Sequence, residues 1–131
     1  MDFIFYIIYN AYYKDGNYKN DMPAFTVFIL FTLAFFCILL MLADVKVLLT
    51  EGPYVKELGL KKYHIYLLGL MGAVITYLMF YINKRYVNIY DTYKDSRFAN
   101  GYTGKIIGWT GLFIMILSPF IFIYIRNSLY K

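Results

Sequence analysis

The sequence predicts an all-α helical integral membrane protein, in which three transmembrane helices follow a short N-terminal interfacial helix rich in aromatic residues. The first observation is composition: the 131-residue chain is 61% hydrophobic and 16% charged, whereas soluble domains are about 45–50% apolar and about 25% charged. The second is the presence of three uncharged runs, each long enough to cross a bilayer as a helix. We expect one membrane domain over residues 1–131.

The N-terminal segment, at about residues 2–14, is apolar and aromatic but short. The run from Phe3 to Tyr13 would be about 16 Å long as a helix, which is far less than the hydrocarbon core of about 30 Å. Tyrosine rings favour the headgroup level of a membrane. We therefore expect an interfacial helix that lies on one leaflet or dips into it.

The three spans are predicted at about residues 23–44, 63–82 and 105–125. Each contains twenty consecutive residues without Asp, Glu, Lys or Arg, which is a full bilayer crossing. Proline removes a backbone hydrogen bond inside a helix. Pro119 is therefore expected to kink the third span.

Three residues are expected to anchor the spans at the membrane boundary. Lys61 and Lys62 stand at the mouth of the second span, where their long side chains can reach the headgroups. Trp109 lies one turn into the third span, at the depth that tryptophan favours.

An apolar seam continues beyond the second span, over about residues 83–96. Ile82, Tyr86, Ile89 and Tyr93 are spaced by four, three and four residues, and no Gly or Pro intervenes. This pattern predicts that the second span projects from the membrane as one continuous cytoplasmic helix. Two interpretations remain open for its exposed seam, namely contact with a protein partner or adsorption to the headgroups. The candidate partner contacts are Tyr86, Ile89, Tyr90 and Tyr93.

Small residues recur at helical spacing in the second and third spans. Such faces let helix backbones approach closely in lipid. They could form an oligomer interface, but packing between the second and third spans of the same chain is the preferred interpretation. The candidate packing residues are Gly69, Gly72, Ala73, Gly104, Gly108 and Gly111.

The sequence favours a protein that is not an enzyme, with no catalytic residues, no metal and no cofactor. The spans hold no acidic or basic residue at mid-depth, where intramembrane chemistry would need one. His64 is the single histidine and Cys37 the single cysteine, too few to hold haem or zinc. Asp44, with Lys46 and Thr50, could line a cation path, but ordinary charge at a membrane boundary is the preferred interpretation.

The net charge of +5 is attributed to loops next to the membrane, and nucleic-acid binding is not expected. Seven of the 13 Lys and Arg residues share the N-terminal side and six lie opposite, which favours a cytoplasmic N-terminus. The seven are Lys14, Lys19, Lys84, Arg85, Lys94, Arg97 and Lys105. Residues with AT-rich codons are abundant, which suggests a bacterial source and hence the inner (plasma) membrane.

Asn83-Lys84-Arg85-Tyr86 follows an aromatic span, and Gly104-Lys105-Ile106-Ile107-Gly108 precedes the next. In these motifs the last third to half of the chain resembles small uncharacterised bacterial multi-pass membrane proteins. The resemblance implies a membrane protein and carries no function.

These observations lead to one preferred function and two alternatives. The preferred one is a small non-enzymatic membrane subunit that assembles, in the lipid bilayer, with itself or with a larger membrane-protein partner. The first alternative is a pore-forming or membrane-perturbing effector, for example of a bacterial defence system, which the aromatic N-terminal helix motivates. The second is a small channel or transporter subunit.

Overall fold

A computed structural model describes residues 1–13, 22–52 and 60–129 of the chain. Every regular element in these ranges is helical. Three stretches, Met22–Glu51, Lys62–Tyr93 and Tyr102–Ser128, are long and apolar enough to cross a membrane, and a helix precedes them, which confirms the predicted fold class. The elements are α1 (Asp2–Tyr13), α2 (Met22–Glu51), α3 (Lys62–Thr76), the π-helical turn η2 (Tyr77–Tyr81), the 3₁₀ turn η3 (Ile82–Lys84), α4 (Arg85–Tyr93), α5 (Arg97–Asn100) and α6 (Tyr102–Leu129).

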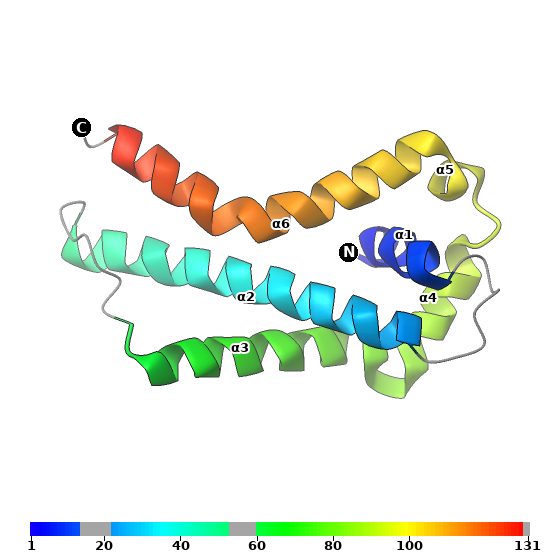
Figure 1. Cartoon of the computed structure of the whole chain (residues 1–131), viewed down its shortest axis with the longest axis horizontal. Coiled ribbons are helices and arrows are strands. Elements are labelled where there is room, and N and C mark those ends of the chain that lie inside the picture. Colours follow the sequence, from blue (N-terminus) through cyan, green and yellow to red (C-terminus); the bar gives the residue numbers. More distant parts are fainter. Residues whose placement is uncertain (14–21, 53–59, 130–131) are drawn as a thin grey trace.

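The helix α2 lies in the middle of the bundle. It packs against α3 on one side and against α6 on the other (Figure 1). Its 30 residues correspond to about 45 Å, so α2 is longer than the hydrocarbon core of about 30 Å. Because α2 separates the two other spans, α3 and α6 keep most of their apolar surface exposed.

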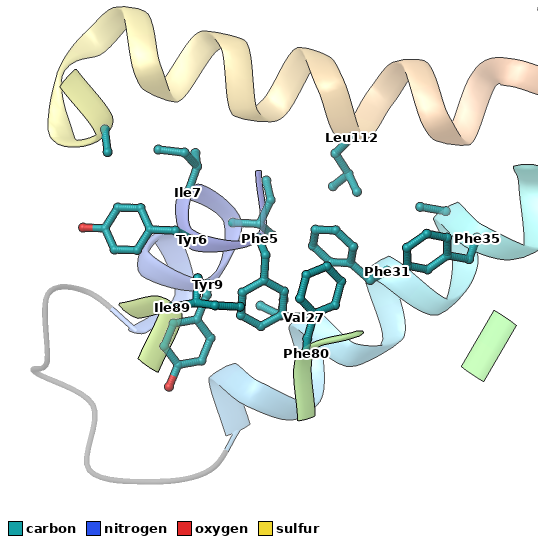
Figure 2. Packing of buried hydrophobic residues seen from close by; sticks show 13 residues of the cluster. Phe5, Tyr6, Ile7, Tyr9, Val27, Phe31, Phe35, Phe80, Ile89 and Leu112 are labelled. Atoms are coloured by element: carbon teal, nitrogen blue, oxygen red, sulfur yellow. The ribbon is translucent and has the colours of Figure 1, made fainter. Parts of the chain in front are cut away.

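The short helix α1 lies between α2 and the N-terminal half of α6 and forms the core of the molecule (Figure 1). Its five consecutive residues 5–9 are each at most 7% exposed. The Phe5 ring lies 4.4 Å from Phe80 and 5.4 Å from Phe31, measured between centroids (Figure 2). Residues 5–9 cover more than one helical turn and are all apolar or aromatic, and a helix segment that is apolar all round is buried rather than surface-bound, so this part of α1 packs inside the bundle.

The prediction of one continuous helix from the second span to residue 96 is wrong. Asn83 and Lys84 both have positive φ angles, of 52° and 56°, so the chain turns sharply between η2 and α4. Asparagine tolerates this left-handed conformation better than most residues do, and a search for Gly and Pro alone misses such a turn. After the turn, α4 packs against α1 (Figure 1).

The last helix, α6, bends in its middle part with the outer side of the bend toward α2, and α1 lies between the N-terminal arm of α6 and α2 (Figure 1). Pro119 lies within α6 and has no N–H to donate to the carbonyl of Met115, four residues earlier. The hydroxyl of Ser118 donates to that carbonyl instead, at 2.8 Å. A side-chain donor therefore replaces the backbone donor that proline removes, and the helix continues to Leu129.

Candidate functional site

The seam of α4 contacts α1 of the same chain. Ile89 is 5% exposed, and Tyr86, Tyr90 and Tyr93 pack against the buried core. Centroid distances between paired rings are 5.9 Å for Tyr86–Tyr9, 5.0 Å for Tyr90–Tyr13 and 5.6 Å for Tyr93–Tyr6. The pattern that suggested a separate partner protein, or the headgroups, is thus accounted for by an intramolecular contact.

The glycines of α6 allow α1 and α5 to approach closely. A Cβ atom at Gly108 would lie 2.6 Å from Cβ of Ile7, and one at Gly111 would lie 2.8 Å from Cδ1 of Ile4. A Cβ at Gly104 would collide with the carbonyl oxygen of Phe98 in α5. This face of α6 is therefore a close-packing surface, and it serves α1 and α5 rather than the second span.

Of the small residues of α3, Gly72 is packed against α2, whereas Gly69 has open space beside it. A Cβ at Gly72 would lie 3.0 Å from the carbonyl oxygen of Thr32 in α2, and beside it Thr32 donates to the hydroxyl of Thr76 at 3.4 Å. A Cβ at Gly69 would meet no atom of the described residues within 4 Å. Ala73 is partly buried. The preferred expectation, direct packing of the second span on the third, is therefore wrong, because α2 lies between them.

Hydrogen bonds hold α1, α4 and α5 together at one end of the bundle. The Tyr6 hydroxyl donates to Oδ1 of Asn100 at 2.7 Å, and Nδ2 of Asn100 donates to the carbonyl of Lys94 at 2.7 Å. Asp2 and Arg85 form an ion pair at 3.0 Å. The buried aromatic contacts and these polar links join α1, α4 and α5 at this end.

A polar pocket of about 430 Å³ opens at this same end. Its wall comes from α1, α4, the turn before α5, α5 itself and the first turn of α6. Its described lining residues all have polar side chains, and they are Asn10, Tyr90, Lys94, Asp95, Asn100 and Lys105. Lys94 also forms an ion pair with Asp91 at 2.9 Å, and this interaction raises its pKa above the usual lysine value. Lys94 is therefore a cation at neutral pH.

An ion pair lies at the far end of α2 and α6. The carboxylate of Asp44 accepts a short hydrogen bond from the guanidinium of Arg126, and the two side chains are only 5% and 13% exposed. The second carboxylate oxygen of Asp44 is buried and has no hydrogen-bond partner among the described residues. The Asp44 carboxylate thus links α2 to α6 through its ion pair with Arg126. Because it is buried and already paired with a cation, this position does not fit a cation path.

The remaining sequence candidates occupy ordinary positions. Lys61 and Lys62 are exposed, and Trp109 is partly buried beside Phe113. His64 accepts a hydrogen bond from the backbone N–H of Lys61 at 3.1 Å. Cys37 is buried with a free thiol. Within the described ranges no group of three or more His, Cys, Asp or Glu residues could hold a metal ion.

Sequence reasoning missed the Asp44–Arg126 pair and the polar pocket. A signal for the pair was present, because each residue lies at the end of an uncharged run on the same predicted side. The pocket had no comparable signal, since its residues come from four separate parts of the chain. No protein-family model, curated protein or solved structure matches this chain.

Proposed function

We propose that this protein is a non-enzymatic membrane subunit that assembles, with a second copy or a larger membrane protein, through the Gly69–Ala73 face of α3. The observation that carries the proposal is the open position of Gly69, where an added Cβ would meet nothing within 4 Å. Gly72, Gly104, Gly108 and Gly111, the other glycines within the spans, each have a close neighbour in the described residues.

Glycine destabilises a helix interior but allows another helix to pack closely against it, which is why the open position of Gly69 supports an interface. A glycine in a helix interior costs about 1 kcal/mol relative to alanine. In lipid this cost is offset where a second helix packs closely against the glycine. Gly69 has no such neighbour among the described residues, and Ala73 follows it by one turn, so a helix from another chain is the partner that fits this face.

Two observations weigh against the two alternative functions. The effector hypothesis rested on an aromatic N-terminal helix available to the bilayer, but residues 5–9 of α1 are buried in the core. Asp44 was the candidate for a cation path together with Lys46 and Thr50, but its carboxylate is held by Arg126 between two helices.

We further propose the bacterial inner membrane, with the N-terminus in the cytoplasm, as the location. The resemblance to small bacterial multi-pass proteins and the slight excess of basic residues on the N-terminal side support this proposal. Lys14 and Lys56, which a topology test would naturally use, lie outside the described residues. In a Cys37→Ser background, cysteines at Lys94 and Lys62 are expected to react with impermeant reagents from opposite sides, with Lys94 inside.

The assembly is tested with two substitutions that add bulk to different faces of α3. Gly69→Leu is expected to abolish or strongly reduce the complex captured by crosslinking in native membranes. Val74→Phe adds bulk at an exposed position on another side of the helix and is the matched control. Both variants are expected to keep the wild-type unfolding midpoint in detergent, because neither position is close-packed within the chain.

The outcome separates assembly from folding. A complex that survives Gly69→Leu at wild-type level contradicts the proposed interface. Equal loss in Gly69→Leu and Val74→Phe would show that any added bulk on α3 disturbs the complex, and would contradict the choice of this face. The mass of the crosslinked species distinguishes a second copy from a larger partner.

A further inference from the structure

The polar pocket at the α1–α4–α5 end contains charged groups that form at most one ion pair each with other described residues. Within the described residues, neither Lys105 nor Asp95 takes part in an ion pair. Lys94 is paired with Asp91 through one contact, which leaves further N–H donors on its ammonium group. Oδ1 of Asn10 is buried and has no hydrogen-bond partner among the described residues. The pocket thus offers both donors and acceptors to a ligand.

The depth of the pocket places it at the level of lipid headgroups. Lys105 directly precedes the uncharged run of residues 106–125, so its ammonium group lies where the hydrocarbon core ends. Trp109, one turn further along α6, is at the depth that tryptophan favours. Lys94 and Asp95 follow α4, outside the membrane-spanning part of the chain. A ligand at this level meets phosphate groups at high local density.

The charges fit a ligand that carries both signs. The ammonium groups of Lys94 and Lys105 can bind the oxygens of a phosphate ester, while the carboxylate of Asp95 can accept hydrogen bonds from a primary ammonium group. The volume of about 430 Å³ lies within the range of small-molecule sites, about 300–1,000 Å³.

We propose that this pocket binds a phosphate ester bearing a primary ammonium group, the chemistry of a phosphoethanolamine headgroup. A choline headgroup fits less well, because its trimethylated nitrogen has no N–H to donate to Asp95. A phosphoglycerol headgroup leaves the Asp95 carboxylate without a cation. The frame of the site is preorganised, since Asn100 is held by Tyr6 and by the Lys94 backbone.

The test uses the full chain in nanodiscs made of phosphatidylcholine with either phosphatidylethanolamine or phosphatidylglycerol. Lipids that stay bound after transfer to detergent are identified by native mass spectrometry. The wild type is expected to retain phosphatidylethanolamine in preference to both other lipids. Lys105→Gln is expected to lower retention of phosphatidylethanolamine about tenfold, which corresponds to about 1.4 kcal/mol and is close to the contribution of one hydrogen bond to a charged group.

Two further variants make the result specific. Asp95→Asn is expected to remove the preference for ethanolamine over choline while leaving phosphate-dependent binding in place. Arg97→Gln changes the same charge at an exposed position of α5 that does not line the pocket, and it is expected to leave retention unchanged. Unfolding midpoints of all variants are measured to show that the fold is intact.

Each outcome decides the proposal. Equal retention of the three lipids, or preference for phosphatidylglycerol, would overturn it. Equal losses in Lys105→Gln and Arg97→Gln would also overturn it, because general surface charge would then explain the binding. Displacement of the lipid by soluble O-phosphoethanolamine at millimolar concentration supports the headgroup chemistry and shows that a soluble ligand can also occupy the pocket. Retention of the lipid under this competition identifies the lipid as the ligand.

Discussion

Breaking the ion pair between Asp44 and Arg126 is expected to destabilise the packing of α6 on α2 strongly. Arg126→Gln leaves the Asp44 carboxylate, which is 5% exposed, without its cation. Removing one partner of a buried pair typically costs about 3–5 kcal/mol. Little discount for solvent screening applies here, because the Arg126 side chain is itself only 13% exposed.

The reverse experiment separates the cost of an unpaired charge from the net contribution of the pair. The double variant Asp44→Leu with Arg126→Met replaces both charged groups by apolar ones of roughly similar size. Buried pairs exchanged in this way are commonly neutral or stabilising, by about 1–4 kcal/mol. The double variant is therefore expected to be at least as stable as the wild type, although each single change is destabilising.

The assay is reversible unfolding of the purified protein by SDS in mixed micelles, followed by Trp109 fluorescence and by helix content. Lys94→Gln removes a pair with Asp91 that is about half exposed on both sides, and no measurable change is expected from it, because surface pairs contribute little. If the single variants at Asp44 or Arg126 shift the free energy of unfolding by less than about 1 kcal/mol, the pair is solvated and the reasoning from burial is refuted.

Three other substitutions test the packing and the turns. Gly108→Leu is expected to destabilise the protein by about 1–3 kcal/mol through overpacking, because even a Cβ atom at this position would lie 2.6 Å from Ile7. Unchanged stability in detergent would contradict this contact. Asn83→Val is expected to lower the free energy of unfolding by about 1–2 kcal/mol, because Asn83 has a positive φ of 52°. Asn83→Gly is expected to be tolerated. If the helix were continuous through residue 83, valine would be tolerated better than glycine. Ser118→Ala leaves the Met115 carbonyl without its side-chain donor and is expected to cost about 1 kcal/mol, which the same unfolding assay measures.

The membrane-spanning helices could be predicted from the sequence because their cause is local. Twenty consecutive residues without an acidic or basic charge determine where a chain crosses a bilayer, whichever other helices surround them. The short helix at residues 2–13, the seam of Tyr86, Ile89 and Tyr93, and the close-packing role of Gly108 also follow from local pattern. The seam residues and the glycines of α6 lie in close contacts, but with other partners than those that the sequence suggested.

The identity of those partners was decided by the tertiary structure alone. Whether Tyr86 meets another protein, the headgroups or α1 depends on the turn at Asn83, and the free energy that favours this turn comes from burying α1 between α2, α4 and α6. The Asp44–Arg126 pair joins positions 82 residues apart, and the polar pocket draws its lining from α1, α4, α5 and α6. Local periodicity determines which residues seek burial or a charged partner, but it contains no information on which of several equally apolar or oppositely charged surfaces meets them. That choice is made by the packing of the whole chain.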